Sequence, residues 1–296
     1  MNRIKHSKGD RAFFVINDIF LALALLIVLL PVVYIISSSI SSPTAVMTGR
    51  VLLWPVDFSL EGYAAVFKYP VIITGYLNSI FYTVAGSAIN ILMTVLAAYP
   101  LSRKKMAGRN TIMFLFTFTM IFSGGLIPSY MLASSLNLTN NRWVMLLPGA
   151  ISVYNLIICR TFFQNNIPAE LFEAASIDGC NHIRFLSSVV LPLSKPILAV
   201  LLLYYAVGHW NAYFNAFIYL SDRDKFPLQI ILREILVRNT IDPSVMYDPQ
   251  LEGVKQGLGD LLKYSLIIVA TVPFMVAYPF VSKHFVKGAL TGAVKG

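Results

Sequence analysis

Residues 166–196 read NIPAELFEAASIDGCNHIRFLSSVVLPLSKP, a long polar stretch between two hydrophobic ones. Pro168 suits the first turn of a helix, where its missing N–H costs nothing, and the acidic residues that follow favour the positively polarised end of that helix. Gly179 is a natural helix stop, and residues 181–190 are long enough for a second short helix before Pro192 interrupts it. Two short helices joined at a glycine predict a docking element.

The composition of the chain is that of a membrane protein. Of its 296 residues, 57% are hydrophobic and only 12% are charged, whereas soluble domains have about 25% charged residues. A helix needs about 20 apolar residues to cross the hydrocarbon core, where no water pairs with the backbone. We therefore expect an all-α, polytopic fold with a short tail (1–12) and a single transmembrane domain (13–296). The six expected spans are about 13–37, 76–99, 111–133, 143–163, 194–219 and 261–282.

The net charge of +9 is distributed in the way that orients membrane proteins. Lys and Arg gather on alternate loops and at both ends, whereas the intervening segments carry about as many carboxylates as cations. Cytoplasmic segments carry such a basic excess, so both termini and residues 166–196 are predicted to be cytoplasmic. In this interpretation Arg103, Lys104 and Lys105 need only orient the protein, and nucleic acid is excluded as a partner.

The fifth expected span combines aromatic rings with amides. Asn211 and Asn215 are four residues apart and share a face if the helix is continuous. Rings that cover apolar sugar faces and amides that bond hydroxyl groups suit a path for a polar, ring-shaped solute. A membrane belt of aromatic residues and ordinary helix interfaces are the alternatives, and a lone His209 is more often a satisfied interior histidine. The candidate path residues are Asn78, Asn90, Tyr205, His209, Trp210, Asn211, Tyr213 and Asn215.

Catalytic and metal-binding motifs are missing from the sequence. There is no phosphate-binding loop, no zinc-protease motif and no hydrolase elbow. Cys159 and Cys180 have neither a disulfide framework nor a metal spacing, so we interpret them as two lone thiols. Asp18, Asp260 and Lys263 lie near the ends of the spans, whereas ion coupling usually requires such residues in the interior, so an ion-driven carrier is disfavoured. The chain is therefore expected not to be an enzyme, and as a transporter it must borrow its energy or be passive.

Two segments in the last third of the chain, a long loop and the C-terminal tail, have the composition of contact regions. Residues 221–259 form a long exterior loop with an expected helix from Pro227 to Val237. A loop of this length usually has a function, and we expect this one to contact an external partner. Residues 283–296 form a cationic, glycine-rich cytoplasmic tail.

The polar stretch resembles a known signature. Glu173-Ala174-Ala175, then Gly179, Val189 and Leu191-Pro192, resembles the EAA loop of permease subunits of bacterial ATP-binding-cassette (ABC) importers, with Val189 in place of the usual isoleucine. The residues around Pro168 and after Pro192 look like the carbohydrate branch, and residues 290–296 are similar to the C-terminus of the maltose-type second permease.

The resemblance implies how the chain works. Two coupling helices would sit in a cleft of the ATPase subunit, and the residues in that role would be Glu170, Glu173, Ala174, Ala175, Asp178, Gly179, Leu191 and Pro192. The implied partners are a sister permease, two ATPase subunits that bind ATP and Mg²⁺, an extracytoplasmic binding protein and the bilayer of the cell membrane. The implied solute is an oligosaccharide, with a polyol or an amino acid as alternatives. Two functions of a different class, a passive channel and a membrane scaffold, remain as alternatives.

Overall fold

The computed structural model describes residues 8–238, 261–276 and 279, and every regular element in these ranges is a helix. The chain divides into two compact units. One contains Met1–Tyr69 and Leu232–Thr271, and the other contains Pro70–Ile231 and Val272–Gly296. Parts of the expected exterior loop (239–259), of the sixth span (277–278, 280–282) and all of the tail 283–296 lie outside the described residues.

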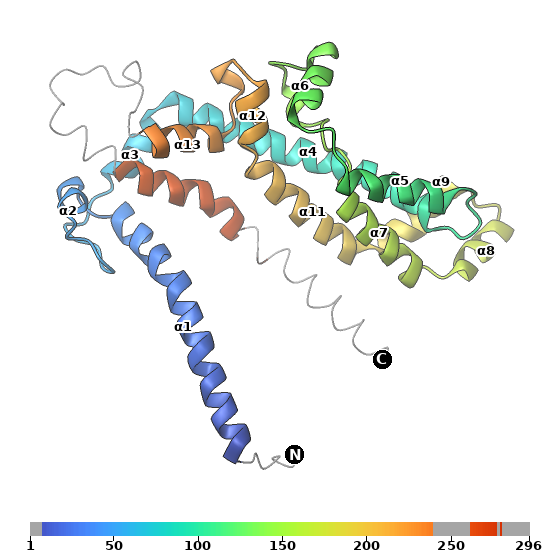
Figure 1. The fold of residues 1–296 in the computed structure, drawn as a ribbon, viewed down its shortest axis with the longest axis horizontal. Coiled ribbons are helices and arrows are strands. Elements are labelled where there is room, and N and C mark those ends of the chain that lie inside the picture. The colour runs from blue at the N-terminus through green and yellow to red at the C-terminus, as the bar shows by residue number, and fades with distance from the viewer. Residues whose placement is uncertain (1–7, 239–260, 277–278, 280–296) are drawn as a thin grey trace. The chain divides into compact units, whose positions relative to one another are not determined.

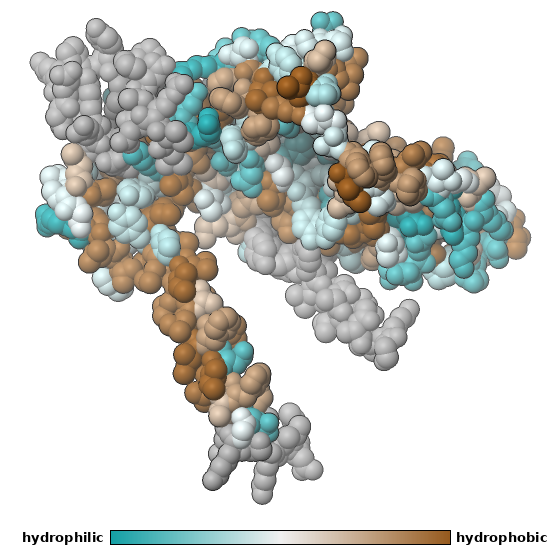
Figure 2. Space-filling view, in the orientation of Figure 1, coloured by the Kyte–Doolittle hydropathy of each residue, from teal (hydrophilic) through white to brown (hydrophobic). Residues whose placement is uncertain are grey.

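The first unit is built on one long apolar helix. Its elements are α1 (Lys8–Ser39), α2 (Pro43–Met47), α3 (Glu61–Lys68) and part of an apolar helix over Leu261–Val276. No residue in the most apolar stretch of α1 is buried, and the face of the helix that Figure 2 shows is largely hydrophobic. A helix of this kind is stable where lipid or another apolar surface surrounds it. The rings of Tyr34 and Tyr264 pack edge to face, with centroids 5.6 Å apart.

The second unit is organised around α4 (Pro70–Ser102), which packs along α7 and α11 (Figure 1). Its other elements in chain order are α5 (Arg109–Ile121), α6 (Leu126–Ser135), η1 (Arg142–Met145), α7 (Val153–Asn166), α8 (Ala169–Ile177), α9 (His182–Phe185), the π-helical turn η2 (Leu186–Val190), α10 (Leu191–Leu193), α11 (Lys195–Trp210), α12 (Phe214–Tyr219), η3 (Arg223–Lys225) and the start of α13 (Leu228–Arg238). The helix expected over Pro227–Val237 corresponds to α13.

Small residues let the neighbours of α4 approach it closely. A methyl group at Gly86 would overlap the imidazole ring of His209 on α11, and one at Gly75 would overlap Ile231. Close approach at glycine is the usual way in which helices pack in a membrane. Gly86 therefore determines how near α11 lies to α4.

Three expected spans are interrupted in the structure. The third was expected over 111–133, but its helix ends at Ile121 and resumes at Leu126 with a bend of 113°. Gly125 has a φ of +84°, which a continuous right-handed helix does not allow. The fourth was expected over 143–163, but only Val153–Asn166 is α-helical after a short 3₁₀ turn. Pro148 lacks a donor and Gly149 has a φ of +76°, so an unbroken helix was the wrong prediction.

The fifth span, expected over 194–219, is also divided. Helix α11 ends at Trp210 and α12 begins at Phe214. The side chain of Asn211 donates a hydrogen bond to the Val207 carbonyl oxygen at 3.0 Å, a local bond that competes with helix continuation. The expectation that Asn211 and Asn215 share a helical face is therefore wrong.

Two described helices, Ala12–Ser39 and Pro70–Ser102, are each long and apolar enough to cross a membrane. Up to four spans result if each of two bent pairs is a single span: α5 with α6, and His182–Leu193 with α11, which meet at 83°. The apolar helix Leu261–Val276 is shorter. The described residues thus confirm an all-helical membrane architecture.

Candidate functional site

The expected docking element begins and ends as local backbone rules dictate. Helix α8 starts at Ala169, directly after Pro168, so this proline lies at the N-cap and not within the first turn. At the other end Gly179 has a φ of +75°, its N–H bonds the Ser176 carbonyl at 3.1 Å, and the Cys180 N–H bonds the Ala175 carbonyl at 2.9 Å. These two bonds define a Schellman motif, for which glycine is the preferred residue.

The second half of the element differs from the prediction. We expected one helix over 181–190 that breaks at Pro192. Instead the chain continues through α9, the π-helical turn η2 and α10, and it bends at Ser194. Asn181 caps α9 by accepting a 2.8 Å hydrogen bond from the Arg184 N–H. The wide π-helical turn before Pro192 makes room for the proline ring, which would otherwise clash with the preceding turn.

Helix α8 presents a mixed surface to the outside. None of its residues is buried, and Ile177 and the nearby Ile183 are 87% and 80% exposed. Around them the surface at this end of the unit is largely hydrophilic (Figures 1 and 2). Exposed apolar residues with a polar rim are typical of protein interaction sites.

The predicted docking residues are placed in different ways. Glu173 lies 3.6 Å from Lys105 of its own chain, in an ion pair that solvent screens strongly. Ala175 packs against the buried core, and Leu191 does the same from α10. The members of the predicted set that are exposed are Glu170, Glu173, Ala174, Asp178, Gly179 and Pro192.

Arg103 has a role that its sequence context did not indicate. Its guanidinium carbon lies 4.7 Å from the ring centroid of Tyr99, 5.5 Å from that of Phe172 and 5.1 Å from that of Phe185. His182 stacks on Phe172 at 4.5 Å, and its Nδ1 is 3.3 Å from the Tyr99 hydroxyl. We call these five residues the Arg103 cage. The interpretation of Arg103 as a mere orienting charge is wrong, and only tertiary packing reveals its partners.

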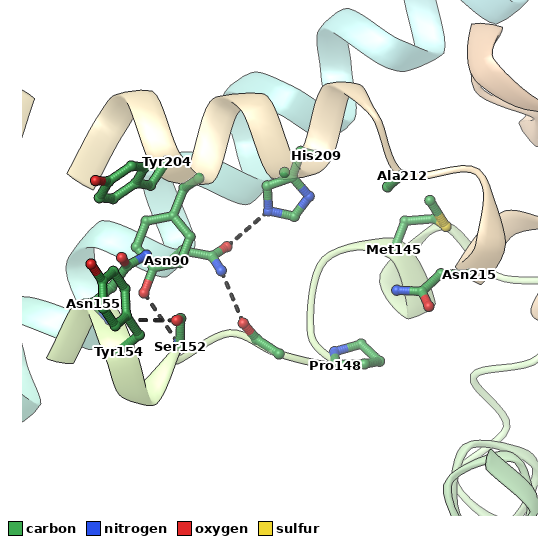
Figure 3. A pocket seen from close by; sticks show the side chains of 13 residues that line it. Asn90, Met145, Pro148, Ser152, Tyr154, Asn155, Tyr204, His209, Ala212 and Asn215 are labelled. Carbon is green, nitrogen blue, oxygen red and sulfur yellow. Dashed lines mark hydrogen bonds between the residues drawn. The ribbon is translucent and has the colours of Figure 1, made fainter. Parts of the chain in front are cut away.

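A pocket of about 400 Å³ lies between α4, α7, α11 and the irregular segment before α7 (Figure 3). It is lined by Asn90, Met145, Pro148, Gly149, Ser152, Tyr154, Asn155, Tyr204, Tyr205, Gly208, His209, Ala212 and Asn215. No Lys, Arg, Asp or Glu is among these residues. The lining therefore offers a ligand amides, hydroxyl groups, an imidazole and aromatic rings.

Asn90 and His209 form the polar wall of the pocket. The Asn90 side-chain amide donates to the Gly149 carbonyl oxygen at 3.1 Å (Figure 3). This bond satisfies a carbonyl in the interrupted span and places the Asn90 oxygen toward His209, 3.0 Å from its Nε2. Since that oxygen only accepts, Nε2 carries the hydrogen. In the neutral imidazole, Nδ1 is then left as an acceptor.

Tyr205 connects α11 to two other elements. Its hydroxyl lies 2.6 Å from the Thr94 hydroxyl on α4 and accepts a 3.2 Å bond from the Ser152 N–H at the start of α7. The rings of Tyr154 and Tyr204, which also line the pocket, pack against each other with centroids 6.3 Å apart. These hydrogen bonds and ring contacts hold the aromatic side of the pocket in a defined shape.

The pocket brings together half of the predicted path residues. Asn90, Tyr205, His209 and Asn215 line it. Trp210 instead packs between the rings of Tyr76 and Phe274. The remaining three, Asn78, Asn211 and Tyr213, lie elsewhere. The predicted set did not include Tyr154, Asn155 and Tyr204, which also line the pocket. Tyr154 and Asn155 are a polar, aromatic pair that the sequence could have indicated. Their position was not predictable because the fourth expected span is interrupted just before them.

Asn78 belongs to the framework of the second unit. Its amide donates to the Asp224 and Phe226 carbonyl oxygens at 2.7 and 3.1 Å, and its oxygen accepts a 3.2 Å bond from Arg142. Asn78→Leu removes all of these bonds and leaves the buried Phe226 carbonyl unpaired, at a cost of about 1–3 kcal/mol. We expect a lower thermal unfolding midpoint and an unchanged apparent affinity for solute in the surviving protein. A weaker affinity at wild-type stability would contradict this framework role.

Hydrogen bonds hold the start of the expected exterior loop in place. Lys225 Nζ donates to the Asn140 carbonyl oxygen at 2.6 Å and to the Asp222 carboxylate at 2.8 Å. The bond from Lys225, and another from Asn140, hold the pKa of Asp222 below its usual range. The described part of this loop is therefore an ordered surface.

Comparisons with known proteins agree with a permease of this kind. The chain is 42% identical to the polygalacturonan/rhamnogalacturonan transport system permease protein YtcP of Bacillus subtilis over 282 residues, 94% of this chain and 96% of that protein. It is 39% identical to protein LplC of the same organism, covering 100% and 99% of the two chains. A solved bacterial ABC transporter that imports the acidic polysaccharide alginate contains a chain with a TM-score of 0.89 and 35% identity, covering 96% of this chain and 100% of that one. No family model matches the sequence.

These observations define a membrane-embedded transport subunit. The chain belongs to the permease subunits of carbohydrate ABC transporters, the membrane components of binding-protein-dependent importers. The resemblance expected from the signature in residues 166–196 is confirmed, and the passive channel and the scaffold are set aside.

Proposed function

We propose that this permease imports an oligosaccharide, a fragment of a polysaccharide, through a complex with a sister permease, two ATPase subunits and an extracytoplasmic binding protein. The observation that carries the proposal is the exposed α8, ended by the Schellman motif at Gly179 and surrounded by polar surface. ATP and Mg²⁺ would be bound in the ATPase. Relatives named for transport of polygalacturonan and for import of alginate support the class of solute.

Six spans with both termini in the cytoplasm complete the proposed topology. The basic residues around 103–109 and 184–195 lie at the same end of the second unit as α8 (Figure 1). This end then faces the cytoplasm and the ATPase, as positive residues favour. The loop over 221–259 would face the binding protein. In this topology α8 and α9 are the cytoplasmic coupling helices.

The pocket is the proposed contact of this chain with the sugar. Amides at Asn90, Asn155 and Asn215 and the rings of Tyr154 and Tyr204 match the hydroxyl groups and apolar faces of a pyranose ring. Sites for small ligands commonly combine such apolar walls with a few placed polar groups. The polyol and amino-acid alternatives are less well served, because a linear polyol has no ring face for Tyr154 and Tyr204 and most amino acids lack the hydroxyl groups that the amides match.

Asn215→Leu is the sharpest test of the pocket, because Asn211→Leu is its matched control. Both exchanges replace an amide by an apolar group of similar size, but only Asn215 lines the pocket, whereas Asn211 bonds its own helix. Loss of one or two hydrogen bonds to sugar should raise the half-saturating oligosaccharide concentration about tenfold in Asn215→Leu. Sugar-stimulated ATP hydrolysis by the reconstituted complex is the measurement.

Equal behaviour of the two variants would remove the pocket from the sugar path. If the complete wild-type complex, loaded with binding protein, shows no stimulation by any oligosaccharide, the importer proposal itself fails. Stimulation by amino acids or polyols in its place would assign another solute.

A further inference from the structure

We propose that the Arg103 cage is a second mechanical connection between the docking helices and the translocation path. This connection runs through α4 and is separate from the covalent one, in which the chain continues from α9 through α10 into α11. The inference rests on the proposed docking of the ATPase at α8. It assigns Arg103 as a positioning residue for coupling, with Tyr99, Phe172, Phe185 and His182 as its partners.

The cage joins three separate elements. Tyr99 belongs to the end of α4, Arg103 directly follows that helix, Phe172 lies on α8, and Phe185 ends α9. Phe172 and Phe185 meet edge to face at 5.1 Å, so the rings also hold one another. The guanidinium therefore contacts α4 and both docking helices at the same time.

The rings are the main partners of the guanidinium. Among the described residues, no carboxylate lies within ion-pair distance of Arg103; the neighbouring Glu173 instead pairs with Lys105. The Arg103 Nε atom is buried and has no hydrogen-bond partner. A partly desolvated cation over aromatic faces is held by the ring quadrupoles, and a planar guanidinium stacks in a way that an ammonium does not.

The path from the cage to the pocket is a single continuous helix. Asn90 and Tyr99 both lie on α4, nine residues apart, which corresponds to about 14 Å along the helix axis. Asn90 in turn holds His209 and the Gly149 carbonyl in the pocket wall. When the ATPase moves α8, the cage pulls the end of α4, and because α4 runs without a break from Asn90 to Tyr99 the polar wall of the pocket moves with it.

The test compares Arg103→Gln with Lys104→Gln in the complete reconstituted transporter. Both variants remove one positive charge from the same turn, but only Arg103 contacts the rings, whereas Lys104 is exposed. We expect Arg103→Gln to retain the bound ATPase and basal ATP hydrolysis while sugar uptake per ATP hydrolysed falls about tenfold. Hydrogen exchange of the α8 amides should become about tenfold faster because the helix is no longer held against α4. Lys104→Gln should match the wild type in all four measurements.

Two further variants separate coupling from general damage. Phe172→Leu keeps an apolar side chain but removes a ring face, and it should reproduce the loss of coupling. Phe172→Tyr restores the face and should restore uptake. Wild-type uptake per ATP in Arg103→Gln overturns the proposal, and so does loss of the bound ATPase in that variant, since the cage would then serve docking alone. Failure of the wild-type complex to bind the ATPase or to respond to sugar would instead refute the proposed function.

Discussion

Replacement of Gly86 by leucine is expected to abolish transport and to destabilise the protein severely. Even the first side-chain carbon at this position would overlap the imidazole of His209. Overpacking of a helix interface typically costs about 1–3 kcal/mol and more where the backbone cannot shift. Here α4 and α11 form the most extensive helix contact of the second unit, so separating them also disrupts the hydrogen bond between His209 and Asn90. The measurement is the thermal unfolding midpoint together with sugar uptake.

The structure provides a matched control for this effect. Gly208 lies on α11, one residue before His209, yet a methyl group there would meet no atom within 4 Å. Gly208→Ala should therefore leave stability nearly unchanged, whereas Gly86→Ala already lowers it. The double variant Gly86→Ala with His209→Ala should recover part of the loss, because the overlapping ring is gone. Equal unfolding midpoints for the two single alanine variants would show that the helices do not meet at Gly86.

Gly179→Val is expected to abolish the stable association of the ATPase. Valine at a φ of +75° is strongly disfavoured, and such strain costs about 1–3 kcal/mol. The turn would relax by giving up the bonds to the Ala175 and Ser176 carbonyls, and α9 would then no longer follow α8 in the arrangement that forms the docking surface. The measurement is the amount of ATPase that copurifies with the permease complex.

Gly108→Val introduces a closely similar strain at a different place. Gly108 has a φ of +73°, and a side chain there, as at Gly179, would meet no atom within 4 Å. It precedes α5 and contributes nothing to the turn between α8 and α9. Both variants should lose comparable stability, but only Gly179→Val should lose the ATPase. Equal copurification in the two variants would remove the α8–α9 turn from the docking surface.

The predicted docking element shows which features short-range backbone preferences determine. The helix over Ala169–Ile177 and its end at Gly179 follow from a proline before it, carboxylates in its first turns and a glycine after it, and all of these act within a few residues. The second helix was less predictable. A π-helical turn accommodates Pro192, so the break moved to Ser194.

The proposed sugar path shows which features short-range sequence patterns do not predict. Four of the eight predicted residues line the pocket, and Asn78, Trp210, Asn211 and Tyr213 do not. All eight have the polar or aromatic chemistry of a sugar path, so composition does not separate them. What separates them is the break in the helix after Trp210 and the partners that Asn78 finds on distant segments.

One amino-acid sequence was enough to predict an all-helical membrane permease of the carbohydrate ABC family with a long polar stretch over residues 166–196. Hydropathy, charge bias and helix caps depend on residues that are close in sequence, so they can be recognised in a single sequence. The folded structure was needed to find where the spans break, which amides line the pocket and that Arg103 joins α4 to α8 and α9. These features depend on contacts between residues far apart in sequence, such as Gly86 with His209 and Arg103 with Phe172, which no local pattern specifies.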